Sequence, residues 1–124
     1  MKAIGRKTWA IPGGHIPLKS NGHEPEFTSR DEAHLLNTGD SDAHLEITVY
    51  YAGRDPAGPY RICVSARRVR VVRFNDLIDP QALPLDEDFA CVITSDEPVV
   101  VQFSRQDTSQ AENARLSALG FPGG

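Results

Sequence analysis

The chain has 124 residues, a formal net charge of −4 and 40% hydrophobic residues. A chain of this length buries about two thirds of its unfolded surface without metals or disulfides, so we expect a single domain over residues 1–124. The negative net charge disfavours binding of nucleic acid through overall electrostatic attraction. No apolar run approaches the roughly 20 residues that span a membrane, and the N-terminal segment is too interrupted for a signal peptide.

The N-terminal third predicts one strand followed by a long loop. Residues 2–11 form the strand, with Trp9 among its bulky apolar side chains. The Pro-Gly-Gly triplet at 12–14 is expected to end it, because proline lacks a ladder donor and glycine favours turns. Prolines and the turn-forming pairs Asn21-Gly22 and Gly39-Asp40 interrupt residues 15–42, which predicts a packed loop with short strands.

The middle of the chain predicts two strands around a tight turn. Residues 44–51 alternate apolar and polar side chains, which is the period of a strand with one buried face. The turn lies at residues 55–59, where proline fixes φ and glycine tolerates positive φ. Residues 60–64 form the second strand.

An arginine-rich strand is predicted next, at residues 67–74. Its alternation places Val69 and Val71 inward and Arg68 and Arg70 on the opposite face. A further valine directly after Val71 breaks the alternation, which predicts a bulge or burial on both faces.

Two apolar strands are predicted in the last third of the chain. A proline-rich connection at 79–88 precedes strands at 89–94 and 98–105. Polar residues at 95–98 predict a hairpin-like turn between these strands. Residues 110–119 fit a helix by propensity and a strand by alternation, and both alternatives stay open.

Short strands at intervals of about ten residues, with turn signals between them, predict an all-β fold. We expect a single-domain β-sandwich, jelly-roll-like, with about seven to eight antiparallel strands and little helix. The glycine-rich end at residues 120–124 is expected to be a flexible tail.

The two cysteines, Cys63 and Cys91, lie inside apolar strand patterns. Free cysteine packs like a small hydrophobic side chain, so we expect two buried free thiols, with a disulfide as the alternative. Free thiols indicate a reducing compartment, which predicts a cytoplasmic location.

Polar residues near the predicted strand ends suit a small hydroxylated ligand such as a sugar. Sugars stack a C–H face on an aromatic ring, while carboxylates, amides and arginines bind their hydroxyl groups. The candidate ligand-binding residues are Trp9, Glu26, Asn37, Asn75, Gln102 and Arg105. A single Trp is more often a core residue, and Glu26 and Asn37 also fit turn caps.

The arginine-rich strand offers a second candidate surface, made of Arg67, Arg68, Arg70 and Arg73. Guanidinium groups match phosphates bidentately and insert into the DNA minor groove, which suggests contact with nucleic acid. The alternative is pairing with aspartates and glutamates of neighbouring strands or subunits, at about 0–1 kcal/mol for each exposed pair. The net charge of −4 favours this pairing.

Catalytic and metal-binding patterns are not predicted. The four histidines have no compact ligand spacing. A phosphate-cradling cysteine loop needs an arginine six residues after the cysteine, and the residue six positions after Cys63 is Val69. No serine has the context of a nucleophile elbow. We therefore expect no enzyme, no metal site and no cofactor.

Six motifs run in order along nearly the whole chain: GRKTWAIPGG, PEFTS, LLNTGDSDAHLEITVYY, PAGPYRICVSARRVRVVRFNDL, VITSDEPVVVQFSRQD and SQAENA. Together they resemble the Anabaena sensory rhodopsin transducer family. The resemblance implies a cytoplasmic β-sandwich that assembles into a homotetramer, without inserting into a membrane.

The resemblance also implies a function. The namesake role of the family is to receive signals from a membrane sensory rhodopsin, and relatives without a rhodopsin are interpreted as small-molecule sensors, including sugar-binding ones. A signalling or adaptor protein is therefore expected, with a sensory rhodopsin and a sugar-like small molecule as partners and DNA as a less favoured one. A purely structural oligomer, stitched together by arginines and acids, is the remaining alternative.

Overall fold

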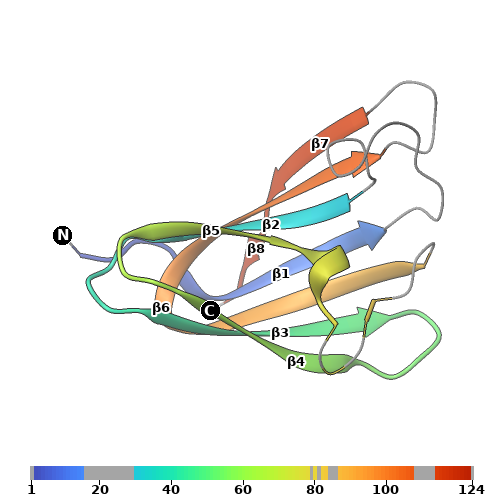
Figure 1. The fold of residues 1–124 in the computed structure, drawn as a ribbon, viewed down its shortest axis with the longest axis horizontal. Helices are drawn as coiled ribbons and strands as arrows, with labels where there is room; N and C mark the ends of the chain where they lie inside the picture. Colours follow the sequence, from blue (N-terminus) through green and yellow to red (C-terminus); the bar gives the residue numbers. More distant parts are fainter. Residues whose placement is uncertain are drawn as a thin grey trace.

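The computed structural model of the chain has two antiparallel β-sheets that share one long strand (Figure 1). The structure describes residues 2–15, 30–78, 80, 82–83, 87–107 and 114–123. The elements are β1 (Arg6–His15), β2 (Arg30–Asn37), β3 (Ala43–Tyr51), β4 (Ala57–Val64), β5 (Arg68–Arg73), η1 (Phe74–Asp76, a 3-10 turn), β6 (Asp88–Asp107), β7 (Ala114–Leu119) and β8 (Phe121–Pro122). The prediction of an all-β, sandwich-like fold is confirmed.

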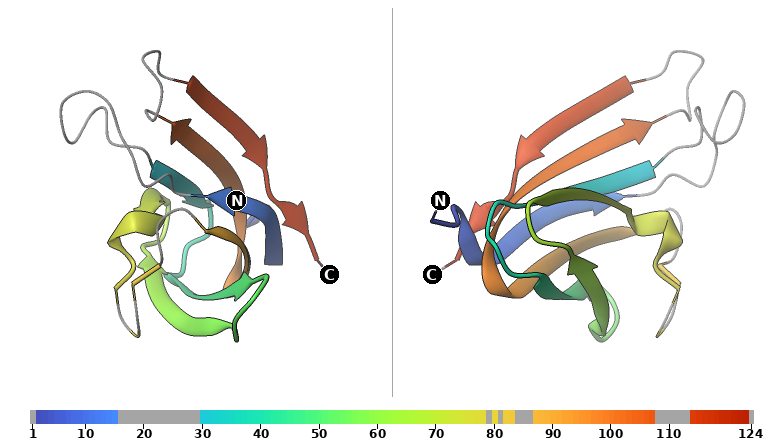
Figure 2. Two further views of the ribbon diagram at one scale, coloured as in Figure 1. Left: turned by 90° about the vertical axis from the view of Figure 1, so that its right-hand side faces the viewer. Right: turned by 60° about the vertical axis from the view of Figure 1, so that its left-hand side comes forward.

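The shared strand is β6, which is 20 residues long. Its first half pairs with β1 and β3, giving the order β4-β3-β6-β1-β8. Its second half pairs with β2 and β7, and β2 also pairs with β5. Figure 2 shows β7 beside the second half of β6 at one end of the molecule, with β3 and β4 at the other.

The hairpin predicted at residues 95–98 is wrong, because β6 continues through this segment. Pairing with β3 ends at Ser95, and pairing with β2 begins at Val100. Pro98 cannot donate to a ladder, so it is tolerated where the strand leaves one sheet for the other. The polar segment therefore marks a change of sheet, not a reversal of the chain.

The predicted end of the first strand is also wrong. β1 passes through the Pro-Gly-Gly triplet to His15, with a register shift against β6 between Ile11 and Gly14. Pro12 lies within this register shift, and no described strand pairs with the opposite edge of β1 beyond Ala10, so a proline is tolerated at this position.

Three further predictions concern the segments that contain β2, β7 and β8. β2 lies in the segment expected to be a loop with short strands, whereas residues 16–29 lie outside the described part. The ambiguous segment 110–119 contains a strand, β7, at residues 114–119. The expected flexible tail instead contributes β8, which pairs with β1.

The core lies between the two sheets. On β3 the alternation is as predicted, with Leu45, Ile47 and Val49 buried. Three phenylalanine rings meet in the core, with the Phe74 centroid 5.3 Å from that of Phe89 and 6.3 Å from that of Phe103.

The predicted orientation of β5 is wrong. Val69 and Val71 are 63% and 47% exposed, whereas Val72 is buried. Val72 and the buried Phe74 set the inward phase, so the two earlier valines fall on the outer face. The register between β2 and β5 is continuous from Glu32 to Asn37, so the adjacent valines form no bulge.

Candidate functional site: a polar groove and an arginine-rich edge strand

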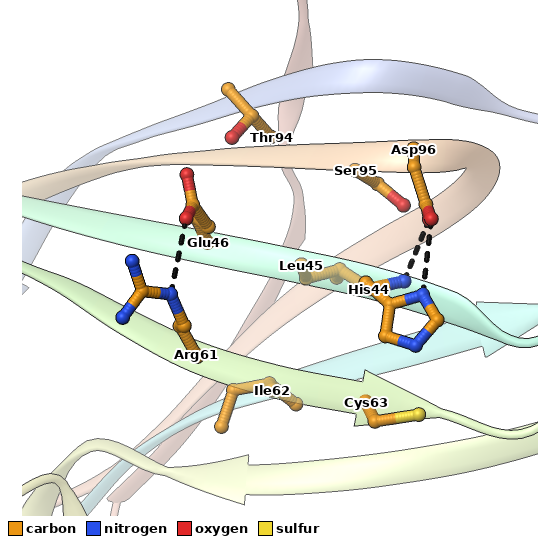
Figure 3. A pocket seen from close by; sticks show the side chains of 9 residues that line it. All are labelled: His44, Leu45, Glu46, Arg61, Ile62, Cys63, Thr94, Ser95 and Asp96. Atoms are coloured by element: carbon orange, nitrogen blue, oxygen red, sulfur yellow. Dashed lines mark hydrogen bonds and ion pairs between the residues drawn. The ribbon is translucent and has the colours of Figure 1, made fainter.

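A groove of about 500 Å³ lies over three neighbouring strands, β3, β4 and β6 (Figure 3). We call it the polar groove. It is lined by His44, Leu45, Glu46, Arg61, Ile62, Cys63, Thr94, Ser95 and Asp96. The alternation of each strand brings its polar side chains to this surface, while Leu45 is part of the core.

Two side-chain pairs cross the polar groove, a histidine with an aspartate and an arginine with a glutamate. His44 Nδ1 lies 3.0 Å from Asp96 Oδ2, and the His44 main-chain N–H donates to Asp96 Oδ1 at 2.7 Å. Arg61 Nε donates to Glu46 Oε2 at 3.3 Å. All four side chains are at least half exposed.

The electrostatics of the groove are clearest at Asp96. The hydrogen bond from the His44 main-chain N–H is the main cause of a lowered pKa for the Asp96 carboxyl. The small burial of the group opposes this shift, and the hydrogen bond and charge of the His44 ring reinforce it. Asp96 is therefore ionised at neutral pH and only accepts hydrogen bonds.

The groove offers both signs of charge to a ligand. Exposed ion pairs are worth only about 0–1 kcal/mol, so their partners exchange for ligand groups at little cost. A carboxylate accepts from hydroxyl groups, and a guanidinium donates two parallel bonds to a ligand carboxylate or phosphate. Thr94 adds an exposed hydroxyl from β6. The arrangement suits a small polar molecule with hydroxyl or charged groups.

Trp9 lies in the core and not on a binding surface. Its side chain is 7% exposed, and its indole N–H donates to the main-chain oxygens of Val99 at 2.8 Å and Arg6 at 3.1 Å. A ring so enclosed presents no face for a sugar to stack on, which favours the core alternative that the sequence left open.

Asn37 stabilises the turn between β2 and β3. It is fully buried; its amide N–H groups donate to the carbonyls of Ser41 and Val64, and its Oδ1 accepts from the Gly39 main-chain N–H. These bonds tie the end of β2 to the start of β3 and the end of β4, as the turn-cap alternative predicted.

Of the remaining predicted ligand residues, the structure places only the side chain of Gln102. Gln102 is exposed on β6, opposite His34 of β2 and outside the polar groove. Glu26 lies outside the described residues, and the side chains of Asn75 and Arg105 do as well.

The arginine-rich strand is exposed along an edge, because β2 is the one strand that pairs with β5 among the described residues. Arg67, in the turn before β5, binds Asp40 with Nη2 and Oδ1 2.6 Å apart, which fits the predicted pairing with acids. Arg68 and Arg70 instead donate to main-chain oxygens, of Arg67 at 3.0 Å and Cys63 at 2.7 Å. Arg73 is half-buried, and its Nε is a buried donor without a partner among the described residues.

Sequence reasoning missed the residues of the polar groove. The signal was present in the register of the β3–β4 hairpin, which places Glu46 opposite Arg61 and His44 opposite Cys63. Opposite charges at directly paired positions of one face indicate a cross-strand contact. The contribution of Asp96 was hidden, because its segment was interpreted as a turn.

The two cysteines differ in exposure. Both thiols are free, but Cys63 is exposed and only Cys91 is buried, so the prediction of two buried thiols holds for Cys91 alone. In the described part of the chain β4 pairs with β3 alone, and Cys63 falls on the outward phase between Ile62 and the buried Val64. Burial raises the pKa of the Cys91 thiol to about 12.

Among the described residues, no group of three or more His, Cys, Asp or Glu side chains is placed to hold a metal ion. No helix in the same part of the chain has the length and apolar character needed to cross a membrane.

Comparison with known proteins identifies the family. The family model described as Anabaena sensory rhodopsin transducer matches residues 4–122. The solved structure of the Anabaena sensory rhodopsin transducer is 54% identical, with a TM-score of 0.77, over 83% of this chain and 99% of that chain. The crystal structure of Thermotoga maritima 1070 is 25% identical, with a TM-score of 0.81, over 96% of each chain. The chain therefore belongs to the Anabaena sensory rhodopsin transducer family, a family of signalling proteins.

Proposed function

We propose that the chain is a cytoplasmic signalling adaptor that works as a homotetramer and receives its signal from a membrane sensory rhodopsin. The observation that carries this proposal is the 54% identity over 99% of a protein named as a sensory rhodopsin transducer. The exposed valines and arginines of β5 support an edge that contacts another protein, since exposed apolar groups beside charges are typical of interaction surfaces.

A small polar ligand, such as a sugar or a sugar acid, is proposed to bind in the polar groove. The groove has room for a molecule of this size, since ligand pockets measure roughly 300–1,000 Å³. Glu46 and Arg61 supply an acceptor and a forked donor side by side. Glu26, Asn75 and Arg105 remain candidate ligand residues.

Ligand binding is tested by a thermal-shift screen of sugars, sugar acids and phosphorylated metabolites, followed by titration calorimetry of each hit. The variants Glu46→Gln and Arg61→Gln are expected to weaken binding about tenfold, which is about 1.4 kcal/mol. The matched control is Glu87→Gln, which removes an ion pair with Arg54 outside the polar groove. A blank screen, or hits that bind both groove variants with wild-type affinity, would reject the polar groove as the ligand site.

Nucleic-acid binding through β5 is a second candidate function. It is supported by Arg68 and Arg70, whose guanidinium groups donate to carbonyls and not to carboxylates in the described structure. Binding to duplex DNA should fall steeply with salt, and Arg68→Gln with Arg70→Gln should lower the salt slope by about 2 if each arginine contacts one phosphate. Salt-independent binding, or an unchanged slope in the double variant, would remove this candidate.

A further inference from the structure

We propose that Cys63, His44 and Asp96 form a thiol-modification site, at which Cys63 exchanges with small disulfides derived from amino acids. The three residues lie in a row across β4, β3 and β6. His44 is the register partner of Cys63, and the pairing of Leu45 with Ser95 sets His44 against Asp96. Directly opposed residues share one face, with Cβ atoms about 4.5–5.5 Å apart. Figure 3 shows the His44 ring between Asp96 and Cys63.

Asp96 fixes the orientation of the His44 ring. Its carboxylate accepts from the main-chain N–H of His44 at 2.7 Å and lies 3.0 Å from Nδ1. An ionised carboxylate only accepts, so Nδ1 carries the ring proton and Nε2 of the neutral ring is left as a proton acceptor. Asp96 is thus a positioning residue, and the register sets His44 on the same face as Cys63, within reach of a proton transfer through a water molecule.

Cys63 is accessible, and the second cysteine is not. Cys63 is an exposed free thiol, whereas Cys91 is buried in the core. The thiolate is the nucleophile in thiol chemistry, so an exposed thiol beside a base is the reactive one and a buried thiol is inert. Cys91 therefore serves as an internal control that should not react.

Two hollows beside Cys63 provide room and charge for the reagent. The polar groove is one, and a second hollow of about 360 Å³ lies toward β5. The charged groups that line the two hollows with Cys63 are Arg61 on β4, His44 and Glu46 on β3, Asp96 on β6, and Arg68 and Arg70 on β5. Three guanidinium groups attract carboxylates, and Glu46 accepts from an ammonium group. This set complements a disulfide that carries both amino and carboxylate groups.

The reaction is a single thiol–disulfide exchange. The Cys63 S–H gives its proton to His44 Nε2, and the sulfur attacks one sulfur of the disulfide R–S–S–R. The Cys63–S–S–R bond forms as the original S–S bond breaks, and the leaving thiolate takes the proton from His44 to become R–SH. Cys63 is oxidised, half of the disulfide is reduced, and no other reactant is required.

The test incubates the full chain with glutathione disulfide and counts adducts by intact mass and peptide mapping. One adduct is expected, on Cys63, with Cys91 unmodified. The thiolate is the attacking form, so removing the base in His44→Asn should slow the reaction about tenfold at pH 7. The rates of wild type and His44→Asn should converge in alkaline solution, where hydroxide replaces the base. Asp96→Asn should also slow the reaction at neutral pH.

Matched variants separate this site from an ordinary exposed thiol. His34→Asn removes a histidine that lies on β2, outside the polar groove, and should leave the rate unchanged. Arg61→Gln should slow glutathione disulfide but not the neutral 2-hydroxyethyl disulfide. Absence of an adduct, modification of Cys91, or equal rates for wild type and His44→Asn from pH 6 to 9 would overturn the proposal. Since these readouts need neither a sugar nor a rhodopsin, they stand apart from the proposed function.

Discussion

At the scale of single residues, burial separates residues that hold the fold from residues that face a ligand. Trp9 and Asn37 have the side-chain chemistry of a sugar site, yet both direct their hydrogen bonds to the main chain inside the protein. Their residue types alone do not distinguish these roles. The sequence could name the chemistry but not the direction in which each side chain points.

Asn37 is predicted to be a stability residue. Asn37→Ala leaves the Val64 carbonyl and the Gly39 N–H without this partner, and each buried unpaired group costs about 1–3 kcal/mol. The free energy of unfolding, measured by urea denaturation, should fall by about 2 kcal/mol or more. Gln102→Ala, at an exposed position, should change it by less than about 0.5 kcal/mol. Equal stability of the two variants would contradict the structural role of Asn37.

Asp96 is predicted to make stability depend on acid. Its carboxyl has a lower pKa in the folded chain than its ordinary value of 3.8, so the folded state binds fewer protons. The resulting stabilisation is fully present above the ordinary pKa and is lost as the pH falls through the folded-state pKa. Between pH 5 and the acid limit, the urea midpoint of Asp96→Asn should therefore fall less steeply than that of wild type. Parallel curves would show that the His44–Asp96 pair adds nothing to stability.

At the scale of elements, the strands themselves were predictable and their continuity was not. The period-2 pattern found β3, and turn signals found the β3–β4 hairpin. Polar and proline-containing segments were interpreted as breaks, yet β6 and β1 both continue through them. Local propensity cannot reveal that a strand has a second sheet to enter, because that depends on partners far away in the sequence.

A close approach between the segment before β1 and strand β6 predicts a glycine requirement. Gly5 has φ +108°, and a Cβ at this position would lie 2.1 Å from the Val99 carbonyl oxygen on β6. Gly5→Ala should lower the free energy of unfolding by about 3 kcal/mol, from backbone strain together with the clash. Gly13→Ala is the control, since nothing lies within 4 Å of its added Cβ, and it should stay within about 1 kcal/mol of wild type. A tolerated Gly5→Ala would contradict the placement of this turn against β6.

At the scale of the whole molecule, the family could be predicted from ordered motifs and the site could not. The motifs span both sheets, so they identify the fold as a unit. The polar groove instead arises where β3, β4 and β6 come together, and only the correct register and an unbroken β6 reveal it. Each cross-strand pair in the groove joins residues from two different motifs, as His44 and Cys63 do, so no single motif contains a whole pair.

The exposed face of β5 predicts how subunits associate. Val69 and Val71 are exposed on an edge strand, opposite Leu36 and His34 of β2. If these valines are covered in the proposed homotetramer, Val69→Glu with Val71→Glu should reduce the mass measured by sedimentation from four chains to fewer. Tyr50→Glu, at an exposed position on β3, is the control and should remain tetrameric. A tetramer unaffected by both valine changes would place the subunit contact elsewhere.

The most direct test of the account is a binding titration of the full chain against a microbial sensory rhodopsin in lipid nanodiscs, in darkness and under illumination. A light-driven rhodopsin pump in the same lipid nanodiscs serves as the control. A signalling adaptor must bind the two states of its receptor with different affinities, because a ligand shifts an equilibrium only by that difference. The account predicts saturable binding to the sensory rhodopsin, with a dissociation constant that changes on illumination. Absence of binding, or identical affinities in the dark, in the light and for the pump, would contradict it.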